Sequence, residues 1–523
     1  MRKVTSAAIA LLATLLALPS LAQDMSFRRG NCLPEGEADA DAAAGHGNAV
    51  RRLPSINKNW DADRVYHQLV ILISFSDTDF KEEDPQTFYD RMLNEEGYNQ
   101  RLGPGCLAEY FREQSGGLFN VQFDVYGPYK VESKAQPYDA PNENTHNYGR
   151  DQMRAATDLF LEEHPDIDFS QYDWNNNGKL NQVIYVCAGF TGNQNNEKCY
   201  GYIWPNTSTF NAISTPDGKK ISDYSCSNEL WANNTSCGFG TIAHEFTHSL
   251  GLPDIYPTSS TGDYSVVDEW DLMDGGNFTN YGWCPSNYTP LEKMLLGWLT
   301  PIELNEPTII SNLKTVADGG EVYMVKNTSN EYYLLENRQW SGWDIGVPGK
   351  GLVIYHVNYN ASSWSSNTVN NKQNAHNFHL IAADNRDYNS WDDFLIDSGA
   401  STQYANSEHM NNLHMSGAPY PLANDEGILN DALTNTSVPA AVVYNENADS
   451  ALLMSKPITD IVQNEDGTVS FKFMNGTLDV IDDFTYGLST KGKGNVYDLQ
   501  GRRIYGRPAR GLVIKDNHKM VIR

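Results

Sequence analysis

The stretch HEFTHSLGLPD, from His244 to Asp254, contains residue types that can bind a metal ion and transfer a proton. On a helix, side chains four residues apart lie on one face, so His244 and His248 can present their imidazoles to a single zinc ion. Glu245 lies one step around the helix, where its carboxylate would reach the attacking water rather than the metal. This spacing predicts a zinc-dependent hydrolytic site with Glu245 as its general base.

The residues around this pattern predict how a third ligand reaches the metal. Gly240 and Thr241 can begin the helix, and Gly251 can end it, because glycine readily adopts the left-handed conformation found at helix C-termini. The chain then reverses, which can bring Asp254 to the same ion and leave a fourth coordination position open, as in catalytic zinc sites. Glu269 is the alternative third ligand, but the compact arrangement of Gly251 and Asp254 favours Asp254.

A His-Glu-x-x-His pattern also occurs by chance in unrelated proteins. Here it is extended by Gly251, by Asp254 and by the loop WDLMDGG at residues 270–276. Over roughly residues 66–360 the sequence resembles the immune-inhibitor-A-like metallopeptidases, a metzincin-related family of secreted bacterial zinc proteases. Further landmarks of this resemblance are LVILISFSD, EYFREQSGGLFNVQFDVYGPY, DWNNNGKLNQVIYVCAGF and EKMLLGWL.

The resemblance implies a role for each residue of the pattern. The implied zinc ligands are His244, His248 and Asp254. Glu245 would be the general base and then the general acid, and Met273 would be the methionine of the turn beneath the metal, where it packs without binding the ion. Many metzincins place a tyrosine two residues after that methionine to assist the oxyanion. This chain has Gly275 there, so the resemblance leaves that role unassigned.

The segments around the zinc pattern predict an α+β fold. The apolar run from Leu69 to Phe75 suits a buried strand, TFYDRMLNEEGY and LAEYFREQSGGLF have helical spacing, and FNVQFDVYGPY alternates like a strand. Beyond Pro301, short runs such as EYYLLENR and GLVIYHVNY predict a mostly β half, with long loops around residues 367–377 and 416–431. We therefore expect a metzincin-like zinc-protease catalytic domain followed by a β-rich, sandwich-like domain.

The N-terminus predicts export. Arg2 and Lys3 precede an apolar run that ends in a small-residue cleavage pattern at Ala22, which is typical of a secretory signal peptide. The run is shorter than the roughly 20 apolar residues that a bilayer requires, and no longer run follows, so no transmembrane segment is expected. The protein is therefore predicted to be secreted, extracellular or located at the cell surface.

The C-terminal residues differ in charge from the rest of the chain. Lys491 to Arg523 holds nine Lys or Arg against two Asp, in a chain whose formal net charge is -28. This break predicts a small basic β module. NVYDLQGRRIYGRPARGLVIKDNHKMVIR resembles the C-terminal tails that some outer-membrane-bounded bacteria route through their type IX secretion machinery. The alternative is a terminal pair of β-hairpins that completes a sandwich.

Together these signals predict five segments and the class of partner. The segments are a signal peptide at 1–22, a leader or propeptide at 23–64, a zinc metallopeptidase catalytic domain at 65–300, a β-rich accessory domain at 301–485 and a basic C-terminal module at 486–523. The acidic balance argues against nucleic acid as the main partner, because phosphate binding depends on Lys and Arg. The expected partners are protein or peptide substrates.

The chain contains seven cysteines, and export to an oxidising compartment predicts disulfides among the last six. Cys32 is left over in a leader that lacks hydrophobic periodicity. Its thiolate could bind the zinc ion and keep a precursor inactive until cleavage after Arg52 removes the leader. The alternatives are that Cys32 has no role or that it pairs with Cys106.

The segment DWNNNGKLNQ has the oxygen-ligand spacing of a calcium loop, with glycine at the sixth position. The candidate calcium-binding residues are Asp173, Asn175, Asn177, Lys179 through its carbonyl, and Asn181. Position twelve is Ile184 instead of Glu, so any ion would be held weakly. An Asn-rich turn without an ion is the alternative, and the sequence leaves both open.

Two classes of function agree with these patterns. The first is a secreted zinc-dependent endopeptidase, and the second is a zinc-containing surface binding or adhesion protein with weak or lost catalysis. Glu245 distinguishes them, because a purely structural metal site needs no base beside an open coordination position. The sequence therefore favours the endopeptidase.

Overall fold

The computed structural model describes residues 53–56, 58–258, 265–372, 375–385, 415–424 and 427–475, together with the backbone of four short strands between residues 496 and 522. The expected signal peptide, most of the expected leader and Cys32 lie outside these residues. Within the described part of the chain, no helix combines the length and the apolar character needed to cross a membrane.

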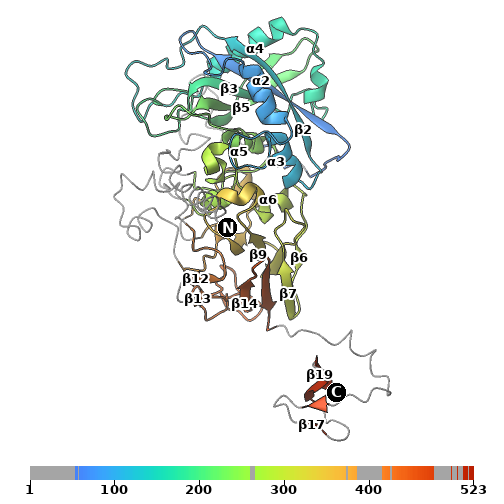
Figure 1. The fold of residues 1–523 in the computed structure, drawn as a ribbon. Helices are drawn as coiled ribbons and strands as arrows, with labels where there is room; N and C mark the ends of the chain where they lie inside the picture. Colours follow the sequence, from blue (N-terminus) through green and yellow to red (C-terminus); the bar gives the residue numbers. More distant parts are fainter. Residues whose placement is uncertain are drawn as a thin grey trace, which may run out of the picture.

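The first half of the chain is built on a five-stranded sheet with the order β2-β1-β3-β5-β4, at the top of Figure 1. The strands are β1 (Val65–Ser74), β2 (Asn120–Lys130), β3 (Val183–Phe190), β4 (Asn206–Ser214) and β5 (Lys220–Leu230). β1, β2, β3 and β5 run parallel, whereas β4 pairs antiparallel with β5 at the edge of the sheet. Strands of a parallel sheet are buried on both faces, which explains the continuous apolar run of β1.

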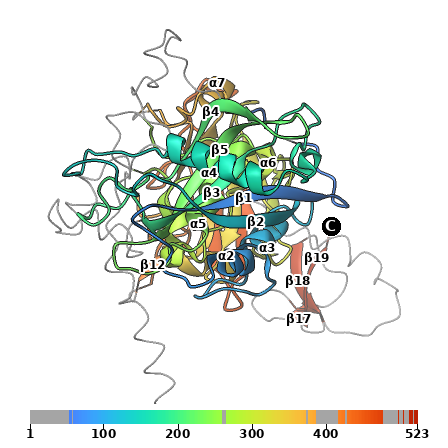
Figure 2. The same ribbon diagram turned by 90° about the horizontal axis from the view of Figure 1, so that it is seen from above.

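Helices cover both faces of this sheet. One face packs against α4 (Arg150–Glu163), and the other packs against α2 (Pro85–Asn94), α3 (Leu107–Gln114) and α5 (Gly240–Ser249), as Figure 2 shows from above. Alternate residues of β1 enter the two cores. Val70 and Leu72 face the core of α2, α3 and α5, and Leu69, Ile71 and Ile73 face the core of α4. The helices and strands expected in this half are confirmed.

The second half is mostly β, as expected. A five-stranded sheet has the order β11-β10-β9-β8-β6. Its strands are β6 (Ile302–Glu303), β8 (Tyr323–Lys326), β9 (Glu331–Arg338), β10 (Gly351–Asn358) and β11 (Phe378–Leu380). A three-stranded sheet packs on one face of it and consists of β7 (Thr308–Leu313), β14 (Ile458–Gln463) and β15 (Val469–Phe473). The expected loop at 416–431 contains a short hairpin, β12 (Leu422–Asn424) and β13 (Gly427–Asn430).

Short helices connect these layers. They are α6 (Pro290–Leu295), α7 (Ala361–Ser365) and the 3-10 helices η3 (Phe169–Tyr172), η4 (Asp268–Trp270), η5 (Gly276–Gly282) and η6 (Gly342–Gly346). In Figure 1, α6 lies between the upper sheet and β9.

One hydrophobic core runs through both halves. β10 shows this by alternation: Val353 and Tyr355 face the core that contains α3 and α5, whereas Leu352 and Ile354 face the three-stranded sheet. The sheet of β9 and β10 is therefore sandwiched between the helices of the first half and a second sheet. The two halves bury their apolar surfaces against each other and therefore share one hydrophobic core.

The described residues before β1 already pack on the fold. Leu53 is buried, and its N–H donates to Ser365 O at 3.2 Å. The Trp60 Nε1–H donates to Leu296 O at 2.7 Å, and the Trp60 ring lies 4.8 Å from the ring of Phe119. Packed structure therefore begins ahead of residue 65, where the sequence placed the end of the leader.

The C-terminal strands form a small antiparallel sheet of their own, with the order β17-β16-β18-β19. The strands are β16 (Val496–Tyr497), β17 (Arg503–Ile504), β18 (Gly511–Lys515) and β19 (His518–Ile522). Strand structure in this segment agrees with the expected β module, and its use as a sorting signal stays a prediction.

The expected disulfides are wrong for the described cysteines. All six are buried thiols, and none is bridged: Cys106, Cys187, Cys199, Cys226, Cys237 and Cys284. Cys187 and Cys226 show the reason. They lie on adjacent strands, but Cys187 is paired with Asn228 and Cys226 with Tyr185, so the two thiols are out of register. Buried cysteine packs as a small apolar residue, and burial raises the pKa of both thiols, which keeps them protonated.

Candidate metal centre

The predicted zinc helix is α5, and it begins and ends where the sequence indicated. Gly240 is its first residue, and a side chain there would collide with Asn277 O, since an added Cβ would lie 1.9 Å away. The helix ends at Ser249, and Gly251 has a φ of 98°. Only glycine adopts this left-handed conformation without strain, and it turns the chain back toward the helix.

This turn brings the three predicted ligands together. The Nε2 atoms of His244 and His248 lie 3.1 Å and 3.4 Å from Asp254 Oδ1. All three side chains are buried. Among the described residues, they form the group whose donor atoms lie close enough together to hold one metal ion. The alternative ligand, Glu269, is buried in η4 but is not part of this group.

Backbone carbonyls orient both imidazoles. His244 Nδ1 lies 2.8 Å from Leu272 O, and His248 Nδ1 lies 2.8 Å from Leu252 O. Each Nδ1 therefore carries the proton that it donates, which leaves Nε2 as the atom that faces Asp254. Among the described residues, the buried His248 Nε2 has no hydrogen-bond partner. Two such nitrogens and one carboxylate oxygen fit a zinc ion, which satisfies all three atoms at once.

The charges of the group also favour a cation. Burial opposes the charged form of His244, but the hydrogen bond to Asp254 and the nearby Glu245 carboxylate together raise the pKa of His244 to about 9. Burial likewise opposes the charged form of Asp254, yet the two imidazoles hold its pKa well below the usual value. The protein thus stabilises positive charge between these side chains.

Glu245 is buried on the same helix but does not belong to the group of three donors. Thr207 Oγ1 lies 2.7 Å from Glu245 Oε2 and 2.8 Å from Glu245 O. Thr207 comes from the edge strand β4, so it connects the sheet to the predicted base. Sequence reasoning did not select Thr207, because nothing local relates a strand residue to a helix residue 38 positions later.

A second unpredicted contact holds Asp254. The Asn367 Nδ2–H donates to Asp254 Oδ2 at 2.7 Å, and the Asp254 N–H donates to Asn367 Oδ1 at 2.7 Å. Asn367 follows α7 in the β-rich half, at the start of a stretch that the sequence indicated only as a long loop.

Tyr256 is a further residue that the sequence did not indicate. It is half-buried, and its ring stacks on the ring of His244 with centroids 6.4 Å apart.

Met273 lies in the loop beneath the helix, in the apolar core, and is not among the three donors. Its carbonyl accepts the Ile255 N–H at 2.9 Å, and the preceding carbonyl, Leu272 O, orients His244. Gly275 lacks a side chain for a steric reason, since an added Cβ would lie 2.2 Å from Asp268 Oδ1. A side chain two residues after Met273 would therefore have to displace the Asp268 carboxylate.

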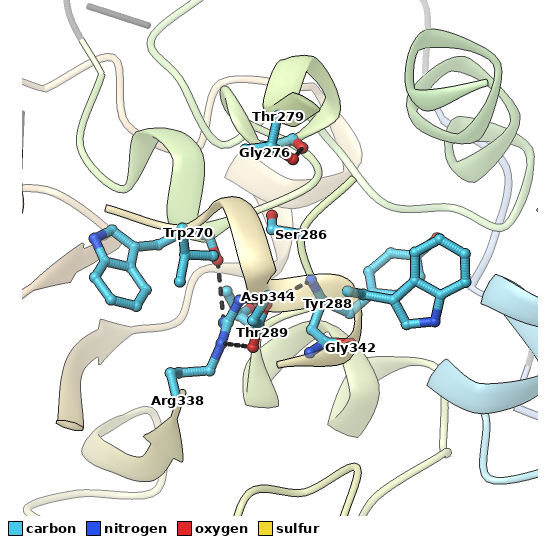
Figure 3. A network of polar contacts seen from close by, with 12 residues as sticks. Trp270, Gly276, Thr279, Ser286, Tyr288, Thr289, Arg338, Gly342 and Asp344 are labelled. Atoms are coloured by element: carbon cyan, nitrogen blue, oxygen red, sulfur yellow. Dashed lines mark hydrogen bonds and ion pairs between the residues drawn. The ribbon is translucent and has the colours of Figure 1, made fainter. Parts of the chain in front are cut away.

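The β-rich half holds this loop in place. Arg338 of β9 donates from Nη1 to Trp270 O at 3.2 Å, and from Nε and Nη2 to Asp344, each at 2.5 Å. Figure 3 shows Arg338 reaching both partners. Two hydrogen bonds between a guanidinium and one carboxylate fix both groups in orientation. Arg338 is fully buried, so the loop that carries Met273 is positioned by a strand of the second half.

The candidate calcium loop is closed by the protein itself. Asp173 accepts the backbone N–H groups of Asn177 and Gly178 at 2.9 Å and 2.8 Å, and its Oδ2 lies 2.8 Å from Lys219 Nζ. Of the other candidates, Asn181 donates to Ser249 Oγ at 3.1 Å. The Lys219 ammonium is therefore a charge partner of the Asp173 carboxylate, and calcium binding at this loop stays a prediction.

Comparison with known proteins agrees with this geometry. The family model for the immune inhibitor A peptidase M6 catalytic domain matches residues 58–184 and 203–296. Immune inhibitor A from Bacillus thuringiensis subsp. alesti is 28% identical over 304 residues, which cover 49% of this chain and 43% of that protein. The pre-pro-metalloprotease PrtV of Vibrio cholerae serotype O1 (strain M66-2) is 24% identical over 307 residues, covering 51% of this chain and 33% of PrtV.

The chain thus spans less than half the length of these relatives. The family match includes the whole of α5, the turn at Gly251 and the loop around Met273. Residues 58–184 and 203–296 of this chain are thus similar to the catalytic domain of the immune inhibitor A peptidase M6 family.

Proposed function

We propose that this protein is a secreted zinc-dependent endopeptidase that hydrolyses peptide bonds of proteins or peptides. The observation that carries the proposal is the buried group of His244, His248 and Asp254, with Glu245 on the same helix but outside the group. When bound, zinc would polarise the scissile carbonyl and lower the pKa of the attacking water. The nitrogen-rich donor set suits zinc better than calcium, which prefers oxygen ligands.

The residues of the chain would carry out the proton transfers. Glu245 would accept the proton of the attacking water and then donate it to the leaving amine. Thr207 supports this role, because its hydrogen bond to Oε2 limits rotation of the Glu245 carboxylate. The name of PrtV, a pre-pro-metalloprotease, and the description of the family model as a peptidase are consistent with proteolysis.

The test is to compare the wild type with Glu245→Ala and Glu245→Gln. Both variants should keep zinc, measured by elemental analysis, because Glu245 is outside the group of donors. Both should lose casein hydrolysis by at least about 100-fold, the lower range of general acid–base contributions. A rate near wild type in either variant would overturn this mechanism.

The competing function is a zinc-containing surface binding or adhesion protein with weak or lost catalysis. Glu245, buried on the same helix as His244 and His248, supports the endopeptidase instead, because a purely structural metal site needs no base beside an open coordination position. A wild type that binds zinc but cleaves neither casein nor a peptide library would favour the binding protein.

Export also belongs to this proposal. Its support is the charged and apolar pattern of residues 1–22. For the basic C-terminal segment, we propose recognition by secretion machinery, supported by its charge and by the small sheet of β16 to β19. Fusing residues 486–523 to a periplasmic reporter in a host with that machinery would test this role.

A further inference from the structure

We propose that Asn367 is a positioning residue for zinc, supplied to the metal centre by the β-rich half of the chain. The inference rests on the proposed function, in which His244, His248 and Asp254 bind zinc. It concerns how the third ligand is held, and it assigns a role to a residue outside the segments that match the peptidase family, 58–184 and 203–296.

The contact between Asn367 and Asp254 is reciprocal. The amide of Asn367 donates to the Asp254 carboxylate through Nδ2 and accepts the Asp254 backbone N–H through Oδ1, each at 2.7 Å. The donated bond goes to Oδ2, whereas Oδ1 is the oxygen that faces the two imidazoles. Asn367 therefore fixes the rotation of the carboxylate and presents one defined oxygen to the metal.

Asn367 can orient Asp254 because its own backbone conformation is fixed by hydrogen bonds. It has a φ of 56°, in the left-handed region that asparagine tolerates better than most residues. Its carbonyl accepts the Thr258 hydroxyl at 2.6 Å. Asn371 accepts the Thr258 N–H at 2.7 Å, and Asn370 donates to Ile255 O at 2.7 Å.

These contacts form a row along one segment of the catalytic domain. Three asparagines after α7 contact the backbone or side chains of residues 254, 255 and 258. The row is anchored in turn, because Asn370 also donates to Phe378 O at 2.8 Å in β11, and Trp364 of α7 is buried in the shared core. The third ligand is thus tied to the second sheet.

The expected effect follows from the role of such outer hydrogen bonds. A ligand that loses its orienting partner must be ordered by the metal itself, which typically lowers metal affinity about 10- to 100-fold. Asn367→Gly is the suitable variant, because glycine accepts the left-handed backbone while the side chain that contacts Asp254 is removed. We expect its zinc dissociation constant to rise about 10- to 100-fold.

Two control variants separate this effect from loss of stability. Asn312→Gly makes the same substitution at the same φ of 56°, at an exposed position of β7. Asn337→Ala removes a buried asparagine that donates to Leu313 O and Gly467 O, at 2.8 Å and 2.9 Å, in the same half of the chain. Both should bind zinc as the wild type does, although Asn337→Ala should lower the melting temperature.

The experiment is zinc competition against a chromogenic chelator with the full-length protein, with casein hydrolysis measured in parallel. Wild-type zinc affinity in Asn367→Gly would overturn the inference. A loss of zinc affinity in Asn337→Ala as large as the loss in Asn367→Gly would overturn it too. If Asn367→Gly does not fold, Asn367→Ser replaces it, because the short serine side chain cannot reach both Asp254 atoms. Asn367→Ser should also weaken zinc binding. Unchanged zinc affinity in Asn367→Ser would overturn the inference as well. A wild type that binds zinc without hydrolysis would contradict the proposed endopeptidase but not the role of Asn367, and a wild type that binds no zinc would contradict both.

Discussion

Two side chains that are neither ligand nor base set the geometry of the candidate centre. Thr207 holds the Glu245 carboxylate from β4, and Asn367 holds the Asp254 carboxylate from the loop after α7. A carboxylate has two equivalent oxygens and rotates easily, so a single hydrogen bond decides which oxygen faces the site. Both contacts involve a charged acceptor, and such bonds are stronger than those between neutral groups.

Thr207→Val tests the first contact. Valine keeps the shape of threonine but cannot donate to Glu245 Oε2, so the carboxylate loses its fixed orientation. We expect kcat to fall about 10-fold, which corresponds to roughly 1.4 kcal/mol, at the lower end of a hydrogen bond to a charged group. Zinc content should not change.

The matched control is Thr209→Val, on the same strand but exposed. Its kcat should equal that of the wild type. If Thr207→Val and Thr209→Val have the same activity, Thr207 does not orient the base.

At the scale of elements, a pair of buried acids connects α6 to the loop that carries Met273. Asp271 lies in the loop, where it accepts the Met273 N–H at 2.7 Å. Glu292 lies in α6, where it accepts the N–H and the hydroxyl of Thr289 in a capping box. Burial, and then the nearby Glu292 carboxylate, raise the pKa of Asp271. Burial raises the pKa of Glu292 to about 7. Burial therefore favours the protonated form of both acids.

This pair predicts how stability depends on pH. The pKa of Glu292 is raised from 4.5 in the unfolded chain to about 7 in the folded protein. The stabilisation is therefore complete below about pH 4.5 and is lost as the pH rises through 7. In thermal unfolding, the melting temperature of the wild type relative to Glu292→Gln should fall by several degrees between pH 5 and pH 8, because glutamine cannot lose a proton.

The comparison with Glu292→Gln separates this effect from other titrating groups, which both proteins share. A difference in melting temperature that stays constant from pH 5 to pH 8 would show that the pKa of Glu292 is not raised in the folded state.

At the scale of the whole molecule, the two halves depend on each other. Their apolar residues form one core, Arg338 of β9 binds the Trp270 carbonyl, and Asn367 binds Asp254. The segments that match the peptidase family end at residue 296, before any of these supports. A metal centre assembled from both halves is fully formed only when the second sheet has folded onto the first.

Truncation tests this dependence. A chain that ends at residue 300 would expose the core surface that normally faces β9 and β10, so it should be insoluble or molten, with little bound zinc. A chain that ends at residue 475 keeps both sheets and should bind zinc and cleave casein as the full-length protein does. Equal zinc content and a cooperative unfolding transition in the shorter chain would contradict the idea of a shared core.

The leader is the remaining part of the molecule with a predicted effect on activity. Pro54 and Ile56 lie against the turn that follows α5, since an added Cβ on Gly251 would lie 2.8 Å from Pro54 O and Ile56 Cα. Cys32 itself lies outside the described residues, and Cys106, its alternative partner, is fully buried. Because thiolate binds zinc at roughly 2.3 Å, Cys32 could hold the precursor inactive.

The signal-cleaved precursor with Cys32→Ser should therefore hydrolyse casein before any processing, whereas the unmodified precursor should not. Processing after Arg52 should bring both to the same activity. A Cys32→Ser precursor as inactive as the unmodified one would show that Cys32 is not the latch.

The local features of the centre could be predicted from the sequence alone. The spacing of His244 and His248, the position of Gly251 and the return of the chain to Asp254 depend on helix geometry and on the conformational freedom of glycine, which act within about ten residues. The apolar run of β1, the alternation of β2 and the β-rich character of the second half are likewise local patterns. All of these are present in the structure.

Only the tertiary structure decided which distant groups support the centre. Asn367 lies 113 residues from Asp254, and Thr207 lies 38 residues from Glu245, so no periodicity relates them. Cys187 and Cys226 form no disulfide because strand register, which depends on the whole sheet, places them apart. The calcium pattern was equally local, and its spacing did not indicate the ion pair between Lys219 and Asp173. Residue spacing determines short-range geometry, whereas long-range contacts depend on how the layers pack.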